Sequence, residues 1–115
     1  MQKNIFGKKN EIIAADYLKN KGYQILEMNY KNKIGEIDIV AKDKDYLVFV
    51  EVKARMSTAF GDPAEAVTLE KQKKIFMVAQ LYLITHGKTN ANCRFDVIAV
   101  IGDENRQIRH IQNAF

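Results

Sequence analysis

Cysteine, proline and tryptophan are nearly absent from this chain of 115 residues, which contains one cysteine, one proline and no tryptophan. The single cysteine, Cys93, cannot form an internal disulfide, which excludes a disulfide-stabilised scaffold and favours the reducing cytoplasm. With only Pro63 and six glycines, the chain has no linker rich in proline or glycine. We therefore expect a single domain covering residues 1–115.

Long apolar runs are also missing. No uncharged stretch approaches the roughly 18 apolar residues of a membrane span, so we expect no membrane association. Residues 1–10 are polar and basic, and no apolar segment of a signal peptide follows them. The only histidines, His86 and His110, have no partner at the spacing of zinc ligands, and Cys93 has no neighbouring base. Zinc binding and thiol catalysis are therefore excluded as functions.

Charge of both signs is abundant and unevenly distributed. The formal net charge is +4, with 18 basic and 14 acidic residues. Residues 1–33, 34–66 and 67–115 carry net charges of +4, −3 and +3. An acidic centre between basic ends is the pattern expected of a cation site within a surface that binds a polyanion.

Hydrophobic periodicity predicts two helices and five strands in the order αβββαββ. Residues 8–21 form an amphipathic helix whose apolar stripe contains Ala14, Ala15 and Leu18, and Glu11 falls on the same stripe. The alternative for Glu11 is an exposed position at the edge of this stripe. Runs rich in Val, Ile, Phe and Tyr predict strands over residues 23–30, 34–42, 46–54, 94–101 and 107–112.

The second helix has two candidate starts. Asp62 and Pro63, followed by Glu65, form a capping box with proline at the first helical position, whereas Thr68 can cap a helix that begins at Leu69. We favour Thr68, with a helix that ends near His86 before Gly87. Because this helix carries the chain to a further strand, we expect an α/β fold with a mixed central sheet flanked by helices.

A hairpin centred on Lys44 and Asp45 predicts the pairing of the second and third strands. In this register Asp38 lies opposite Glu51, and Glu36 lies opposite Lys53. One face then carries an apolar set, and the other carries the four charged residues at one end. The apolar set is Ile37, Ile39, Ala41, Val48, Val50 and Val52.

Ionised carboxylates that face each other across two strands repel, and Lys53 can neutralise only one of them. Glu11 and Glu36 add further negative charge. A divalent cation removes this excess, and all-oxygen ligands favour Mg²⁺ or Mn²⁺. Such an ion activates water and neutralises charge on a phosphoryl oxygen, which suits the hydrolysis of a phosphodiester.

These residues match a known pattern. Asp38, twelve intervening residues and then Glu51-Val52-Lys53, preceded by a helix with Glu11, resemble the PD-(D/E)xK nuclease superfamily of restriction-endonuclease-like folds. Over nearly the whole chain, the sequence more closely resembles the YraN-type family of small bacterial proteins, which is similar to archaeal Holliday-junction resolvases. The motifs that carry this likeness are Gly7, Glu11, Ala15, Leu18, residues 35–38, residues 49–53, Arg55, residues 60–63, Lys71 and residues 94–97.

The resemblance implies a role for each residue of the site. Asp38, Glu51 and the Val52 carbonyl would bind the metal, Lys53 would be the catalytic lysine, and Glu11 would be an accessory acid. Glu36 is either a further ligand or an ion-pair partner of Lys53. Ile37 stands where the superfamily has the proline of its first motif, and this proline shapes a turn and binds no metal.

We therefore expect a metal-dependent endonuclease that acts on branched or damaged DNA, with a homodimer as a possible assembly. Two alternatives remain: a catalytically silent nucleic-acid-binding module, and a protein-interaction domain with vestigial acids. The residues expected to contact DNA are the following: Arg55, Lys71, Gln72, Lys73, Lys74, Lys8 and Lys9.

Overall fold

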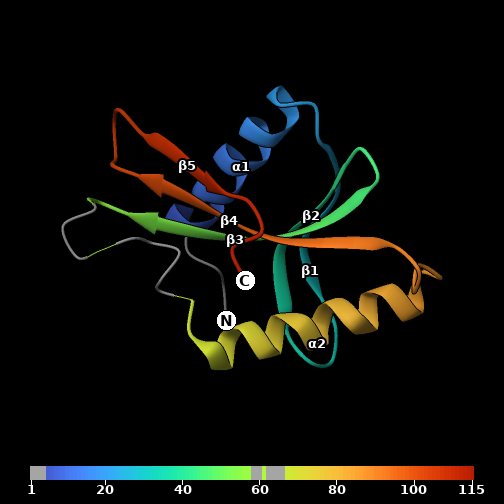
Figure 1. Ribbon diagram of the computed structural model, residues 1–115. Coiled ribbons are helices and arrows are strands. Elements are labelled where there is room, and N and C mark those ends of the chain that lie inside the picture. The colour runs from blue at the N-terminus through green and yellow to red at the C-terminus, as the bar shows by residue number, and fades with distance from the viewer. Residues whose placement is uncertain (1–4, 58–60, 62–66) are drawn as a thin grey trace.

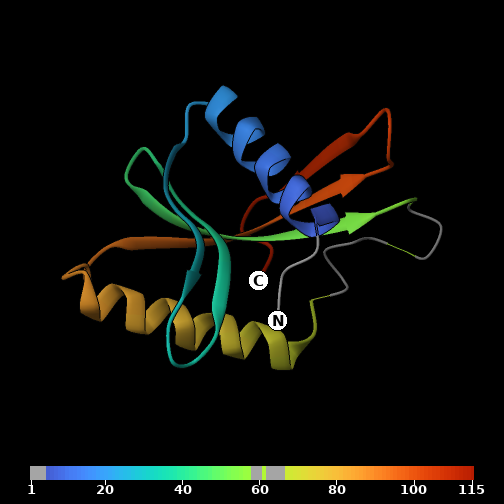
Figure 2. The ribbon, with the colours of Figure 1, turned by 180° about the vertical axis from the view of Figure 1, so that it is seen from behind.

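The computed structural model describes residues 5–57, 61 and 67–115 as a five-stranded mixed sheet with one helix on each face (Figures 1 and 2). The strand order is β1-β2-β3-β4-β5, and only β3 and β4 are parallel. The predicted α/β class with its mixed sheet is confirmed. The elements are α1 (Ile5–Asn20), β1 (Gln24–Lys31), β2 (Glu36–Asp43), β3 (Tyr46–Arg55), α2 (Leu69–Thr85), β4 (Asn92–Ile101) and β5 (Gln107–Ile111).

The start of α2 follows the second of the two predictions. The Lys71 backbone N–H donates to Thr68 Oγ1 at 3.1 Å, so Thr68 caps a helix that begins at Leu69. Asp62 and Pro63, the alternative start, lie outside the described residues. The helix ends as predicted, because Gly87 adopts a φ of +64°, which a residue with a Cβ rarely adopts.

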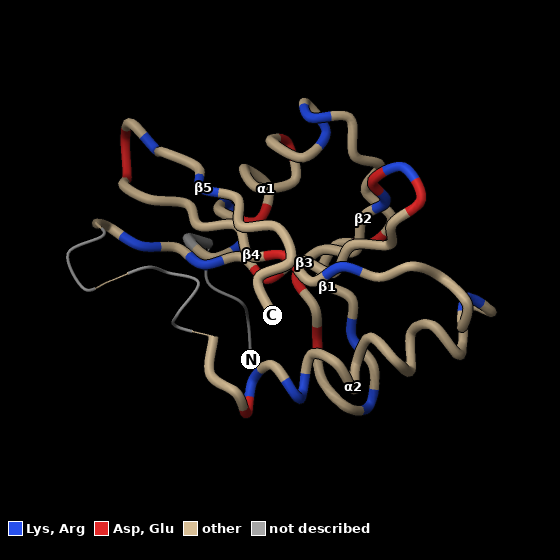
Figure 3. Tube along the Cα trace, viewed as in Figure 1, with Lys and Arg blue, Asp and Glu red and all other residues tan. Residues whose placement is uncertain are grey.

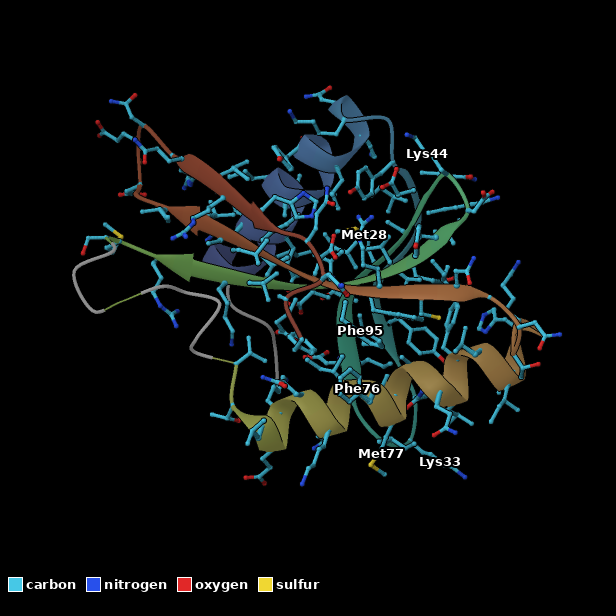
Figure 4. All side chains as sticks on the ribbon, in the orientation of Figure 1. Met28, Lys33, Lys44, Phe76, Met77 and Phe95 are labelled. Carbon is cyan, nitrogen blue, oxygen red and sulfur yellow. The ribbon has the colours of Figure 1, made fainter. Side chains whose placement is uncertain are left out.

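The sheet separates two apolar clusters. On one face, Ala14, Ala15 and Leu18 of α1 pack against alternate residues of β2, β3 and β4. On the other face, the buried side of α2 packs against Val40, Phe49 and their neighbours. Tyr82 belongs to this second cluster, and Phe76, although 39% exposed, points toward Phe95 with its ring centroid 4.7 Å away (Figure 4). Tyr82 is therefore a core residue, whereas Phe76 is partly exposed and packs against Phe95 at the edge of the cluster.

The hairpin register is confirmed near the turn and wrong at the far end. Residues 39–43 of β2 pair with residues 46–50 of β3 in the predicted register. The ladder ends at Ile39 and Val50, so neither Asp38 and Glu51 nor Glu36 and Lys53 are paired across it. Beyond this point β2 stays with β1, where Ile37 pairs with Tyr30.

The reason is a bend in β2. Figure 1 shows β1 and the first part of β2 turning away from β3 toward α2. Ile37, expected on the same face of the sheet as Ile39, packs instead in the cluster on the opposite, α2 face. The bend opens a gap between the start of β2 and the end of β3.

A buried ionic cluster holds the opposite end of the sheet. Asp96, fully buried on β4, accepts hydrogen bonds from Arg94 Nε at 2.9 Å and from the Asn113 backbone N–H at 2.9 Å, and it contacts His110 Nε2 at 2.7 Å. Arg94 also forms an ion pair with Asp43 at 3.1 Å. Asp96 thus makes the structural hydrogen bonds expected of an acid within an apolar strand.

The Asp96→Asn variant should lose about 3 to 5 kcal/mol of unfolding free energy at neutral pH, because Arg94 loses a buried charged partner. Burial raises the pKa of the Asp96 carboxyl, but the bonds from His110, Arg94 and Asn113 outweigh it and leave the pKa below 3.8. The ionised Asp96 carboxylate therefore stabilises the folded protein above about pH 4. This stabilisation is lost as the pH falls through the lower pKa of the folded state.

Urea unfolding of both proteins between pH 3 and pH 7 measures this difference. The difference in unfolding free energy between the wild type and Asp96→Asn should become smaller towards pH 3. An equal difference in unfolding free energy at every pH would show that the Asp96 charge does not stabilise the fold.

Candidate metal centre

Four carboxylates line one open pocket of about 240 Å³ in the gap between the start of β2 and the end of β3. They come from three elements, which are α1 (Glu11), β2 (Glu36 and Asp38) and β3 (Glu51). Three of them are almost inaccessible: Glu11 is 4% exposed, Asp38 8% and Glu51 9%. The structure thus brings together all four acids that the sequence predicts for the site, although the strand pairing expected to do so is wrong.

Asp38 takes over a hydrogen bond that the sheet ladder would otherwise make. The Val52 backbone N–H donates to Asp38 Oδ2 at 2.8 Å. Because the N–H and C=O of one residue point to the same side of a strand, the Val52 carbonyl is also directed toward the gap. The carboxylate and the carbonyl, both predicted metal ligands, therefore lie at the same wall of the pocket.

Glu11 reaches the pocket from α1. Its position on the apolar stripe with Ala15 buries its side chain against the sheet, as predicted, and the exposed alternative is wrong. A helix that is otherwise anchored by Ala14, Ala15 and Leu18 holds this carboxylate at the edge of the apolar cluster.

Glu36 lies at the mouth of the pocket, and its side chain is 42% exposed. Its Oε2 atom is 3.8 Å from Lys31 Nζ, and the two residues are partners in the β1–β2 ladder. The predicted ion pair of Glu36 with Lys53 is therefore replaced by one with Lys31, because β2 follows β1 after leaving β3.

Lys53 and Arg55 stand on the last part of β3, and both are half-buried. By strand alternation, Lys53 is on the same side of β3 as Glu51. Among the described residues, however, the β3 members of the pocket wall are Glu51, Val52 and Ala54, and Lys53 is not one of them. Arg55 Nη1 donates to the Ala54 carbonyl at 2.9 Å.

The remaining predicted DNA contacts are not among the described residues that line the pocket. Lys8 and Lys9 are exposed on α1, and Lys73 and Lys74 are exposed on α2. A Cβ at Gly35 would lie 3.2 Å from Lys74 Cε, so the absence of a side chain at Gly35 lets the Lys74 stem cross the turn before β2. The first turn of α2 also contains Lys71 and Gln72, and Gln72 Nε2 donates to the Val67 carbonyl at 3.0 Å.

Three residues of the described pocket wall were not predicted as site residues, namely Gly7 and Asn10 on α1 and Ala54 on β3. Gly7 and Asn10 of α1 line the pocket beside Glu11, and Asn10 is only 1% exposed. The signal for Asn10 was its spacing, because it precedes Ala14 and Leu18 by four and eight residues and therefore shares their buried row.

The pocket offers the type of ligand atom, oxygen, that Mg²⁺ and Mn²⁺ prefer. Carboxylates and a carbonyl are the oxygen ligands that these ions take. Among residues 5–57, 61 and 67–115, no three side chains of Asp, Glu, His or Cys are grouped so that they could hold an ion. In proteins, Mg²⁺ is usually bound by one or two carboxylates and completes its shell with water and substrate phosphate. Asp38, Glu51 and the Val52 carbonyl would supply the protein ligands.

No helix within the described part of the chain is long and apolar enough to cross a bilayer.

Comparison with known proteins gives one consistent family. The profile of the uncharacterised protein family UPF0102 matches residues 10–100. The chain is 51% identical over 113 residues to a UPF0102 protein of Clostridium botulinum (strain Hall), covering 95% of this chain and 92% of that protein. It is 51% identical over 114 residues to a UPF0102 protein of Clostridioides difficile (strain 630), covering 99% of this chain and 96% of that protein. The YraN-type resemblance is thereby confirmed at the level of the family.

Mn²⁺ should stabilise the wild-type protein, by about 2.7 kcal/mol at a hundredfold excess over its Kd, since only the folded chain assembles the pocket. Glu51→Gln removes a predicted ligand and one repelling charge. In EDTA this variant should be at least as stable as the wild type, and Mn²⁺ should stabilise it far less. Thermal unfolding with Mn²⁺ and with EDTA measures both effects.

Glu104→Gln provides the matched control, because Glu104 is exposed and outside the described wall of the pocket. It should respond to Mn²⁺ as the wild type does. Equal stabilisation of Glu51→Gln and wild type would place the ion elsewhere.

Proposed function

The chain belongs to the family UPF0102, and we propose that it is a metal-dependent endonuclease that hydrolyses phosphodiester bonds in DNA. The observation that carries this proposal is the burial of Glu11, Asp38 and Glu51 in one pocket. Buried carboxylates at one site repel one another and lose hydration, so the folded chain gains from a cation between them.

A hard divalent ion in this pocket supplies a water of lowered pKa and neutralises charge that develops on a phosphate oxygen. In this proposal, residues of the chain position the groups that this chemistry needs. The Val52 N–H fixes the Asp38 carboxylate, and Glu51 approaches from the neighbouring strand. Glu11, in the adjacent helix, can accept a proton from water or hold water in place.

Lys53 is proposed as the group that stabilises negative charge on the phosphate during hydrolysis. It follows Glu51 by two residues on β3, so both side chains leave the strand on the same side. Lys53 is half-buried and is not part of the described pocket wall, so in this proposal it acts on the phosphate and not on the metal ligands. An ammonium there would contact the substrate and not the metal ligands.

The surrounding charge suits a DNA backbone. Figure 3 shows Lys and Arg on the last part of β3 and on the first turns of α2. Contacts of this kind bind phosphates and do not distinguish bases. We therefore propose that the protein selects DNA by structure, with branched DNA as the substrate that the resolvase resemblance favours.

Cleavage of labelled four-way junction, flap, single-stranded and linear duplex DNA tests the proposal. The wild type should cut the branched substrates with Mg²⁺ or Mn²⁺ and not with EDTA. Asp38→Ala and Lys53→Ala should each lower the rate by about a hundredfold or more, because they remove a ligand and the charge that stabilises the transition state.

Exposed Lys44→Ala, in the β2–β3 turn, is the control for Lys53→Ala and should retain the wild-type rate. Salt-sensitive DNA binding without cleavage would replace the nuclease by a binding module. The absence of both binding and cleavage would leave a protein-interaction domain.

A further inference from the structure

The solvent side of α2 carries a row of exposed apolar side chains. Leu69, Met77 and Ile84 are 73%, 53% and 57% exposed, and Figure 4 shows Met77 pointing away from the sheet. Spacings of eight and seven residues place these three on one side of a helix with 3.6 residues per turn. Together with Phe76, which is 39% exposed, they form what we call the outer stripe of α2.

Charge on α2 is confined to its first turns. Its charged residues all precede Ile75, and residues 75–87 contain no Asp, Glu, Lys or Arg. A helix on a protein surface normally carries charged residues on the side away from the core. Because the buried side of α2 already packs on the sheet, an apolar and uncharged outer side is the pattern of a helix that is covered on both sides.

The outer stripe is symmetric about the point between Phe76 and Met77. Leu69 and Ile84 lie equally far from this point along the chain, and so do Lys73 and Gln80. If two copies of α2 pack antiparallel about a two-fold axis at this point, Leu69 meets Ile84 of the partner subunit and Phe76 meets Met77 of the partner subunit. A two-fold dimer requires a surface that complements itself in this way.

Charge also favours the antiparallel arrangement. It places the charged first turns of each helix beside the uncharged part of the other, and Lys73 meets the amide of the partner subunit's Gln80. The last turn of α2 is the negative end of the helix dipole and contains no basic residue, so lysines of a partner approach it favourably. In a parallel pair, Lys73 would instead face the partner's Lys73 and be repelled.

We propose that the outer stripe of α2 is the interface of a homodimer in which two α2 helices pack antiparallel. A second copy of this chain is the partner that fits, because the stripe matches itself both in apolar side chains and in charge. This interface takes up Lys73, whereas Lys74 lies outside the stripe, next to Gly35. The proposal does not depend on the proposed nuclease activity.

Met77→Lys tests the surface. It brings two positive charges to the centre of the dimer and removes apolar contact, so the dissociation constant should rise about a hundredfold or more. Lysine favours an exposed helix position, so circular dichroism should show an unchanged fold. Sedimentation equilibrium over a range of protein concentrations measures the dissociation constant. Met56→Lys is the matched control at a methionine that is 65% exposed elsewhere, and its dimer affinity should stay within about twofold of the wild type.

Substitutions of Gln80 test the antiparallel register. Gln80→Glu places a carboxylate opposite the partner's Lys73 and should tighten the dimer about twofold to tenfold, whereas Gln80→Lys should loosen it by a similar factor. In a parallel pair, position 80 would face its own copy, so both substitutions would loosen the dimer. Loosening by both would therefore overturn the proposed arrangement.

The oligomeric state of the wild type tests the choice of partner. The proposal is overturned if the wild type stays monomeric at about 1 mM protein, whether or not it binds vesicles of anionic phospholipid through this face. It is also overturned if Met77→Lys dimerises as tightly as Met56→Lys does. A monomeric protein that cleaves DNA with Mg²⁺ would refute the dimer alone, whereas a dimer without cleavage would refute only the nuclease.

Discussion

Repulsion among buried carboxylates is the constraint on which this structure depends. Glu11, Asp38 and Glu51 are each less than one-tenth exposed, and they share one pocket with Glu36. An apolar core gives no reason to place acids here, and the ordinary remedy of a buried arginine is used elsewhere in the chain, at Asp96. In the proposed function, a cation bound in this pocket would offset the repulsion between these acids.

The bend in β2 creates the pocket in which these acids lie. Had the hairpin continued in register, Asp38 and Glu51 would have faced each other on a flat sheet, where Lys53 could lie between them. Because the part of β2 before Ile39 is not paired with β3, the Asp38 carboxylate accepts a hydrogen bond from the Val52 N–H, and a gap opens that α1 closes from one side. The same departure gives Glu36 its partner Lys31. Both the geometry of the acids and the direction of the Val52 carbonyl follow from one irregularity in the sheet.

The sequence predicted much of this arrangement from local rules. Periodicity located every helix and strand within three residues at each end, Thr68 identified the start of α2, and the stripe of α1 predicted the burial of Glu11. It did not predict the bend, because alternation of apolar residues continues through Ile37 and Ile39, and only the packing of β1 and β2 toward α2 separates their faces. Asn10 was missed although it shares the spacing of Ala14 and Leu18, because that rule was applied only to Glu11. The link to the PD-(D/E)xK superfamily stays a prediction.

Diffraction from crystals soaked in Mn²⁺, with data collected at the manganese absorption edge, tests the central claim most directly. The account predicts an anomalous peak in the gap between β2 and β3, within about 2 to 2.5 Å of carboxylate oxygens of Asp38 and Glu51 and of the Val52 carbonyl. A Mn²⁺ ion bound only outside this pocket, or no ion in it at saturating concentration, would contradict the account.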